Sequence, residues 1–179
     1  MRPAREGSLV HRYEKRFGVK VQGRQRDYGT SGDNAMLFTR CAEAPNRLSQ
    51  KVTGLIPGKK YALRFVLADL DDVKKPVGKP LDFTFRADIS DSRKVDAGSY
   101  FIVQPGPRTM RYTRAVDGSF TRASFPARQI ATRKIVFIPD KPEVTLTFSD
   151  WRDDRTPGGP TGQKLVLNFI GICPYFEGE

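Results

Sequence analysis

The sequence predicts an all-β fold, an antiparallel β-sandwich of about ten short strands with little or no helix. Apolar and polar residues alternate along several segments, as half-buried strands require. Turn-forming pairs such as Pro57-Gly58 and Asp117-Gly118 separate these segments. No stretch of about 12 residues shows helical periodicity, so we expect no helix longer than about two turns.

The strands differ in how clearly the pattern marks them. In 61–69, Leu63 and Phe65 flank the charged Arg64, and 81–89 and 143–149 alternate in the same way. Segment 164–175 is apolar on both faces, which indicates a central strand covered on both sides. The expected strands are 17–22, 35–40, 48–53, 61–69, 81–89, 100–104, 109–115, 133–138, 143–149 and 164–175.

The 179 residues suit one domain. We expect a basic leader or linker over residues 1–16 and the sandwich over 17–179. The first eight residues hold no apolar stretch that could act as a signal peptide, and no apolar run approaches the roughly 20 residues that span a bilayer. We therefore expect a piece of a longer secreted or cell-surface polypeptide; the alternative is a small intracellular protein with a frayed start.

The net charge of +11 is concentrated in two segments. Residues 1–26 hold eight Lys/Arg against two Glu, and residues 108–134 hold seven against one Asp, which gives +6 in each. Clustered positive charge attracts polyanions, so an anionic partner is one interpretation. Solvated strand faces and a flexible leader are the other.

Cys41 and Cys173 match no metal-binding or redox motif, and His11 is the only histidine, which leaves zinc almost no ligands. The two cysteines therefore form either a disulfide or two buried thiols.

One motif connects these strands to a known family. Ser49-Gln50-Lys51-Val52 is followed by the segment 54–65, Gly-Leu-Ile-Pro-Gly-Lys-Lys-Tyr-Ala-Leu-Arg-Phe. Together with the closing segments 143–151 and 162–172, it resembles the galactose-binding-like jelly roll of many carbohydrate-binding modules. Residues 70–132 remain unassigned, and the usual opening strand of such modules is missing.

The resemblance implies a non-catalytic domain that binds a polysaccharide and is appended to a glycoside hydrolase or lyase, or to a surface protein. It also implies that strand 35–40 runs beside the C-terminal strand. Cys41 and Cys173 are then expected on neighbouring strands, where a disulfide forms only if their Cα atoms lie within about 7 Å.

The loop that begins at Asp150 is the most site-like stretch. An exposed Trp151 offers a flat apolar platform for a sugar ring, and Asp150 can accept hydrogen bonds from hydroxyls. Arg152 and Arg155 suit sulfate or carboxylate groups, because a planar guanidinium binds them bidentately. The alternative is that Trp151 plugs the end of the sandwich while the charged residues are solvated.

A second candidate region interleaves aromatic residues with arginines. Tyr100, Arg111 and Tyr112 represent it, and the mixture suits a sulfated sugar as well as single-stranded nucleic acid. No RNA-binding signature is present, so the sandwich pattern favours the saccharide.

Two acidic clusters are candidates for a structural calcium ion, the only cofactor that the sequence suggests. They are Asp69, Asp71 and Asp72, and the three aspartates within 150–154. Neither matches the spaced Asp-x-Asp-x-Asp-Gly loop, so solvated turn carboxylates are the alternative.

Nothing in the sequence marks an enzyme. Serine chemistry would depend on His11 in the expected leader, and no Gly-x-Ser-x-Gly, Walker or dinucleotide motif is present. Three hypotheses remain: a non-catalytic domain for a sulfated or uronic polysaccharide, a structural or adhesion sandwich that contacts protein or a neighbouring domain, and a basic nucleic-acid-binding β-domain.

Overall fold

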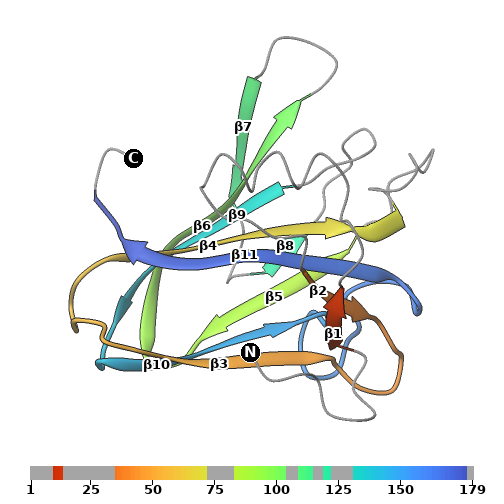
Figure 1. Ribbon diagram of the computed structural model, residues 1–179, viewed down its shortest axis with the longest axis horizontal. Helices are drawn as coiled ribbons and strands as arrows, with labels where there is room; N and C mark the ends of the chain where they lie inside the picture. The colour runs from red at the N-terminus through yellow and green to blue at the C-terminus, as the bar shows by residue number, and fades with distance from the viewer. Residues whose placement is uncertain are drawn as a thin grey trace.

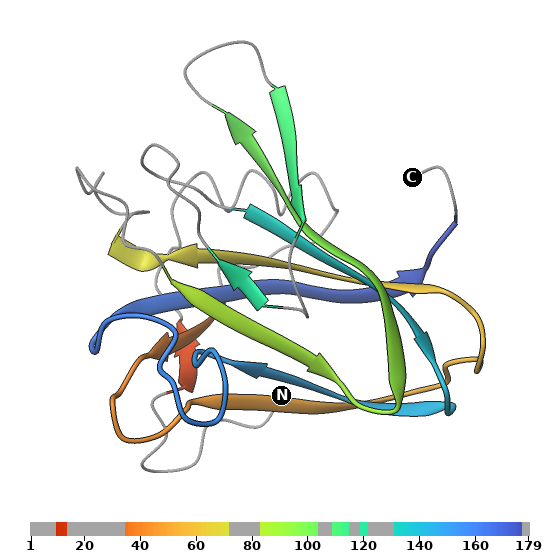
Figure 2. The same cartoon turned by 180° about the vertical axis from the view of Figure 1, so that it is seen from behind.

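The computed structural model describes residues 10–13, 35–71, 83–103, 109–114, 119–121 and 131–176. The elements in this part of the chain are β-strands, arranged as two antiparallel sheets that form a sandwich (Figure 1 and Figure 2). The predicted antiparallel β-sandwich is therefore confirmed. The described residues contain no helix with the length and apolar character that crossing a membrane requires.

The strands divide unequally between the sheets. In sheet order, the large sheet contains β1 (Val10–Tyr13), β2 (Ala35–Thr39), β11 (Lys164–Pro174), β4 (Tyr61–Asp69), β9 (Ala131–Pro139), β6 (Ser92–Val103) and β7 (Thr109–Arg114). The small sheet contains β3 (Arg47–Thr53), β10 (Glu143–Ser149), β5 (Thr84–Ile89) and β8 (Ser119–Thr121). From β2 to β6 successive strands alternate between the sheets, which is jelly-roll connectivity.

The N-terminal boundary differs from the expectation. β1 lies within the expected leader 1–16 and pairs with β2 through register partners such as His11 and Leu37. Part of that stretch is therefore a strand of the sheet, and its four residues were too few to show an alternating pattern. The expected strand 17–22 lies outside the described residues.

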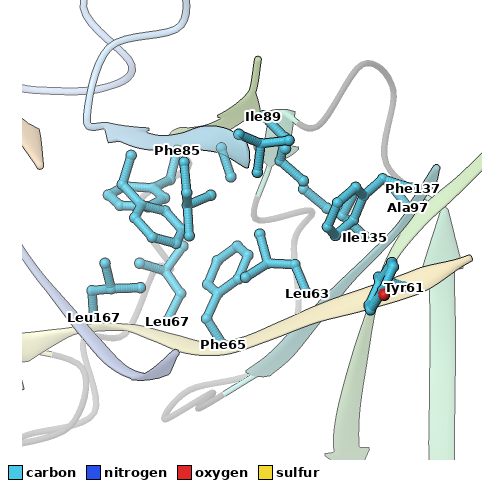
Figure 3. Close-up of a cluster of buried hydrophobic side chains, with 14 of the residues drawn as sticks. Tyr61, Leu63, Phe65, Leu67, Phe85, Ile89, Ala97, Ile135, Phe137 and Leu167 are labelled. Atoms are coloured by element: carbon cyan, nitrogen blue, oxygen red, sulfur yellow. The ribbon is translucent and has the colours of Figure 1, made fainter. Parts of the chain in front are cut away.

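Alternating apolar side chains from both sheets form the core (Figure 3). Leu63, Phe65 and Leu67 of β4 are fully buried on the inner face of the large sheet. Aromatic rings join the two sheets: Phe65 meets Phe148 of β10 edge-on with ring centroids 5.0 Å apart. Burial of these large side chains is the main favourable term that holds the layers together.

The outer face of the large sheet carries a second apolar cluster over β2, β11 and β4. Val166 of β11 is buried there with Leu37, while Leu165 of the same strand is buried in the core. The expectation that the last strand is central and covered on both faces is therefore confirmed for residues 165–167, whereas residues 168–174 are half-buried or exposed. The strand then shifts register between Asn168 and Gly171, with Phe169 in the left-handed region (φ 54°).

The sandwich has two ends that matter for the site. At the turn end, the connections β3–β4, β5–β6 and β9–β10 meet, and the Gly58 amide donates to the Pro139 carbonyl (3.0 Å). Gly58 has φ +80°, which explains the glycine in the predicted Pro57-Gly58 turn. At the loop end, residues 150–163 join β10 to β11, on the right in Figure 1.

Candidate ligand-binding surface

Trp151 anchors the loop 150–163 to the body of the sandwich. Its side chain is only 5% exposed, and its indole Nε1 donates to the Cys41 carbonyl (3.2 Å). Its backbone forms an isolated bridge with Pro157. The prediction of an exposed sugar platform at Trp151 is therefore wrong, because the indole is packed inside and its N–H already has a partner.

Asp150 is fully buried beside it. Its carboxylate accepts hydrogen bonds from the backbone amide (2.9 Å) and the Nδ2 (2.8 Å) of Asn46. Burial raises the pKa of Asp150, because the charged form loses hydration, although the Asn46 hydrogen bonds and the charge of Arg40 oppose this rise. Asp150 thus fixes the loop instead of facing a ligand, contrary to the sequence prediction.

Arg40 lies against the inner side of the loop 150–163 and is the buried cation of this region, only 1% exposed. Its Nε donates to Gln163 Oε1 (3.3 Å), and its Nη2 donates to the Thr84 carbonyl (3.4 Å). Gln163 in turn donates through Nε2 to Asp69 (2.9 Å). Burial lowers the pKa of Arg40, while the charges of Asp150 and Asp69 oppose the shift. We call these side chains the interior network; they are Arg40, Asn46, Asp69, Asp150 and Gln163.

Gly158 lies against the interior network with no room for a side chain. A Cβ at this position would lie 2.2 Å from the Thr84 carbonyl oxygen and 2.7 Å from Arg40 Nη1. The sequence prediction missed Arg40, although a signal existed: Arg40 follows Met36 and Phe38 at a spacing of two, which places it on the inner face of the strand.

The structure does not support the predicted calcium site at Asp69, Asp71 and Asp72. Asp69 is buried and accepts from the Asp71 amide (2.9 Å) as well as from Gln163, while Asp71 is exposed and Asp72 lies outside the described residues. No cluster of three or more His, Cys, Asp or Glu able to hold a metal occurs in the described part of the chain. The second predicted acidic cluster does not form one site either, because Asp150 is buried whereas Asp153 and Asp154 are exposed.

The two cysteines are free thiols and not a disulfide. β2 and β11 are neighbours, as expected, and the antiparallel register pairs Thr39 with Lys164. Cys41 therefore lies beyond the start of β11, whereas Cys173 lies near its far end, opposite Ala62 of β4. The predicted neighbouring strands are therefore confirmed, but no disulfide forms, because the antiparallel register places the two cysteines at opposite ends of β11.

Arg152 and Arg155 lie in the exposed part of the same loop. The Arg152 amide donates to the Thr156 carbonyl (2.9 Å), and the Arg155 amide donates to Asp153 Oδ1 (2.8 Å). The Arg155 hydrogen bond is the main reason that the pKa of Asp153 lies below its ordinary value. These backbone hydrogen bonds fix a tight loop from which both residues are exposed.

Asp154 lies between two arginines on the outer face of the small sheet. Its Oδ1 accepts from Arg47 Nη2 of β3 (2.8 Å) and from Arg86 Nη2 of β5 (3.0 Å). The Arg86 hydrogen bond and charge, followed by the charge of Arg47, lower the pKa of Asp154, so its carboxylate is ionised at neutral pH. The sequence prediction included neither arginine.

Further polar groups extend this surface. Arg86 Nε lies 2.7 Å from Asp88 Oδ2, and the hydroxyls of Ser49 and Thr147 share a hydrogen bond (2.9 Å) across β3 and β10. We call this outer surface the polar face; it consists of Arg47, Ser49, Lys51, Arg86, Asp88, Glu143, Thr145, Thr147 and Asp154. It presents arginines, carboxylates and hydroxyls side by side, which are the groups that hydrogen-bond sugars and their acidic substituents.

The second predicted region lies on β6 and β7. Tyr100 and Tyr112 are register partners across these strands, and Arg111 pairs with Phe101. The pairing brings the three predicted residues to adjacent positions of one ladder. Their role in binding stays a prediction.

Comparison with known proteins leaves the family open. No protein-family model and no curated protein matches the chain. A solved structure titled "CBM4 structure and function" covers 97% of this chain and 92% of its own, with 13% identity and a TM-score of 0.34. A likeness at this level identifies neither a ligand nor a site.

Proposed function

We propose that the chain is a non-catalytic carbohydrate-binding domain of a larger secreted polysaccharide-active or cell-surface protein, and that its polar face binds an anionic polysaccharide. The observation that carries the proposal is the pair Arg47 and Arg86, whose guanidinium groups converge on one carboxylate oxygen of Asp154. Arginine is the side chain best suited to sulfate and carboxylate, because its planar donors match their geometry.

Two further features support the same ligand class. The net charge of +11 favours association with polyanions and makes it dependent on salt. The motif in residues 49–65, which resembles galactose-binding-like modules, forms most of β3, the connection to β4 and the first half of β4. Part of it, Ser49 and Lys51, lies on the polar face itself.

A second candidate function is contact with another protein or a neighbouring domain. The observation that favours it is a set of exposed apolar side chains, Ile56, Val95 and Phe176, which are 48%, 45% and 66% exposed. Apolar exposure of this kind accompanies protein interfaces when it is contiguous. This hypothesis predicts no affinity for polysaccharides.

Binding to heparin and polygalacturonate, with neutral dextran as the control, tests the proposal. We expect retention of the acidic polymers in affinity electrophoresis and loss of that retention as NaCl is raised from about 0.05 to 0.5 M, since screening shortens the reach of the charges. Arg152 and Arg155 flank Asp154 in the exposed loop beside the polar face. Arg152→Gln/Arg155→Gln should therefore flatten this salt dependence more than Lys59→Gln/Arg93→Gln, which removes the same charge from exposed residues at the turn end.

Two results would contradict the proposal. One is the absence of binding to every polysaccharide at low salt. The other is a preference for single-stranded oligonucleotides over acidic polysaccharides of equal charge, which would favour the nucleic-acid hypothesis.

A further inference from the structure

The backbone of the small sheet fixes the positions of Arg47 and Arg86. Both residues are register partners of Ser149, one from each side, so the row runs Arg47, Ser149, Arg86 across β3, β10 and β5. Neighbouring strands lie about 4.8 Å apart, which places the two arginine backbones roughly 10 Å from each other. Two long side chains that start this far apart can meet above the central strand, and they do so at Asp154.

The side chains of Arg86, Arg47 and Asp154 differ in how far they are exposed to solvent. The Arg86 side chain is 20% exposed, and its guanidinium also contacts Asp88 (2.7 Å) and the Arg152 carbonyl (3.5 Å). Arg47 is 48% exposed and Asp154 is 71% exposed. The arginines therefore belong to the sheet, whereas the carboxylate reaches them from an exposed loop and is the most accessible member.

We infer that the Arg47–Arg86 pair binds the carboxylate of an acidic sugar, and that Asp154 occupies this position as an internal competitor. The inference rests on the proposed function and specifies its ligand as a uronate-containing polysaccharide. A uronate carboxylate has the same charge and the same acceptor oxygens as the Asp154 side chain.

A ligand carboxylate can displace Asp154 from Arg47 and Arg86 at low cost in free energy. Exposed ion pairs contribute little to stability, so exchange of one carboxylate for another costs little. A ligand that competes with an internal group binds with an apparent affinity reduced by the fraction of free sites. Removal of Asp154 should therefore strengthen binding, although it removes a hydrogen-bonded ion pair.

Asp154→Ala is the test, with Asp140→Ala as the control of equal charge. Asp140 is an exposed carboxylate at the turn end, and its loss raises the net charge by the same amount. With oligogalacturonate as the ligand, we expect an increase in affinity of roughly three- to tenfold for Asp154→Ala, as release of a largely occupied site predicts, and less than about twofold for Asp140→Ala. The fully methyl-esterified oligomer should show no increase.

Arg47→Gln and Arg86→Gln, each introduced into the Asp154→Ala chain, should abolish the increase. Melting curves must show that each variant is folded, and Asp154→Asn gives a second measurement if the alanine variant is not. An increase that is equal in Asp154→Ala and Asp140→Ala, or a decrease in Asp154→Ala, would overturn the inference. So would an increase of the same size for dextran sulfate, which carries sulfate but no carboxylate.

The two proposals fail in distinguishable ways. If the parent chain binds acidic polysaccharides but Asp154→Ala gains nothing over its control, the internal competitor is refuted and the proposed function stands. If neither the parent nor any variant binds an acidic polysaccharide, the proposed function fails, and the inference fails with it.

Discussion

Two aspartates of the loop 150–163 lie near arginines of other segments, but they differ in their surroundings. Asp150 lies inside the loop end near Arg40, whereas Asp154, four residues later, lies on the polar face between Arg47 and Arg86. Asp150 is fully buried and the side chain of Asp154 is 71% exposed. The same residue types therefore hold the loop in place at one position and face solvent at the other.

The pKa values of the two carboxylates are shifted in opposite directions. It raises the pKa of Asp150, because desolvation outweighs the Asn46 hydrogen bonds and the charge of Arg40. The pKa of Asp154 is lowered instead, by the hydrogen bond and charge of Arg86 and the charge of Arg47. Charged residues in a loop therefore indicate a binding site only where the structure shows that they are exposed.

The largest effect is expected for Arg40→Ala. The change removes the Arg40 hydrogen bonds to Gln163 and the Thr84 carbonyl and the charge that opposes the buried carboxylate of Asp150. Loss of the charge that compensates a buried ion costs about 3–5 kcal/mol. Arg47→Ala, the matched change on the polar face, should cost less than about 1 kcal/mol. Urea unfolding of both variants measures the difference, and similar losses would remove the distinction between the two groups.

The second largest effect on stability is expected for Trp151→Ala, compared with the same change at its neighbour Arg152. Trp151→Ala deletes a buried indole that also donates to Cys41, so we expect a loss of about 3–4 kcal/mol in the free energy of unfolding. Arg152→Ala should change it by less than about 0.5 kcal/mol, since that residue is exposed. A Trp151→Ala chain as stable as its parent, with weaker polysaccharide binding, would restore Trp151 as a ligand-contacting residue.

The smallest expected effect is a difference in how the contributions of Asp150 and Asp154 to stability depend on pH. Because the folded-state pKa of Asp150 is raised, its contribution to stability should decline as the pH rises from about 3.8 through that raised value. The contribution of Asp154, whose pKa is lowered, is present above about 3.8 and is lost as the pH falls through its folded-state value.

Melting temperatures of Asp150→Asn and Asp154→Asn, measured from pH 3 to 7 beside the parent chain, give the two trends. The stability of the parent relative to Asp150→Asn should fall with rising pH, and its stability relative to Asp154→Asn should rise. Trends of the same sign would contradict the assignment of Asp150 as buried and Asp154 as exposed.

The strands that the sequence predicted best are those with sustained alternation. β4 and β10 begin and end where the pattern predicted, at Tyr61–Asp69 and Glu143–Ser149. β8 was missed, since its three residues are too few for a period. β6 begins at Ser92, earlier than predicted, because a register shift between Lys94 and Asp96 interrupts the alternation there.

The amino-acid order alone determined the fold class, since the period-two pattern is written into each strand separately. It could not decide which charged residues are buried. Arg47 and Arg86 lie 107 and 68 residues from Asp154 along the chain, and they meet it only because β3 and β5 flank β10. The antiparallel register likewise separated Cys41 from Cys173. Such contacts depend on strand order and register, which are properties of the whole sheet and not of any one segment.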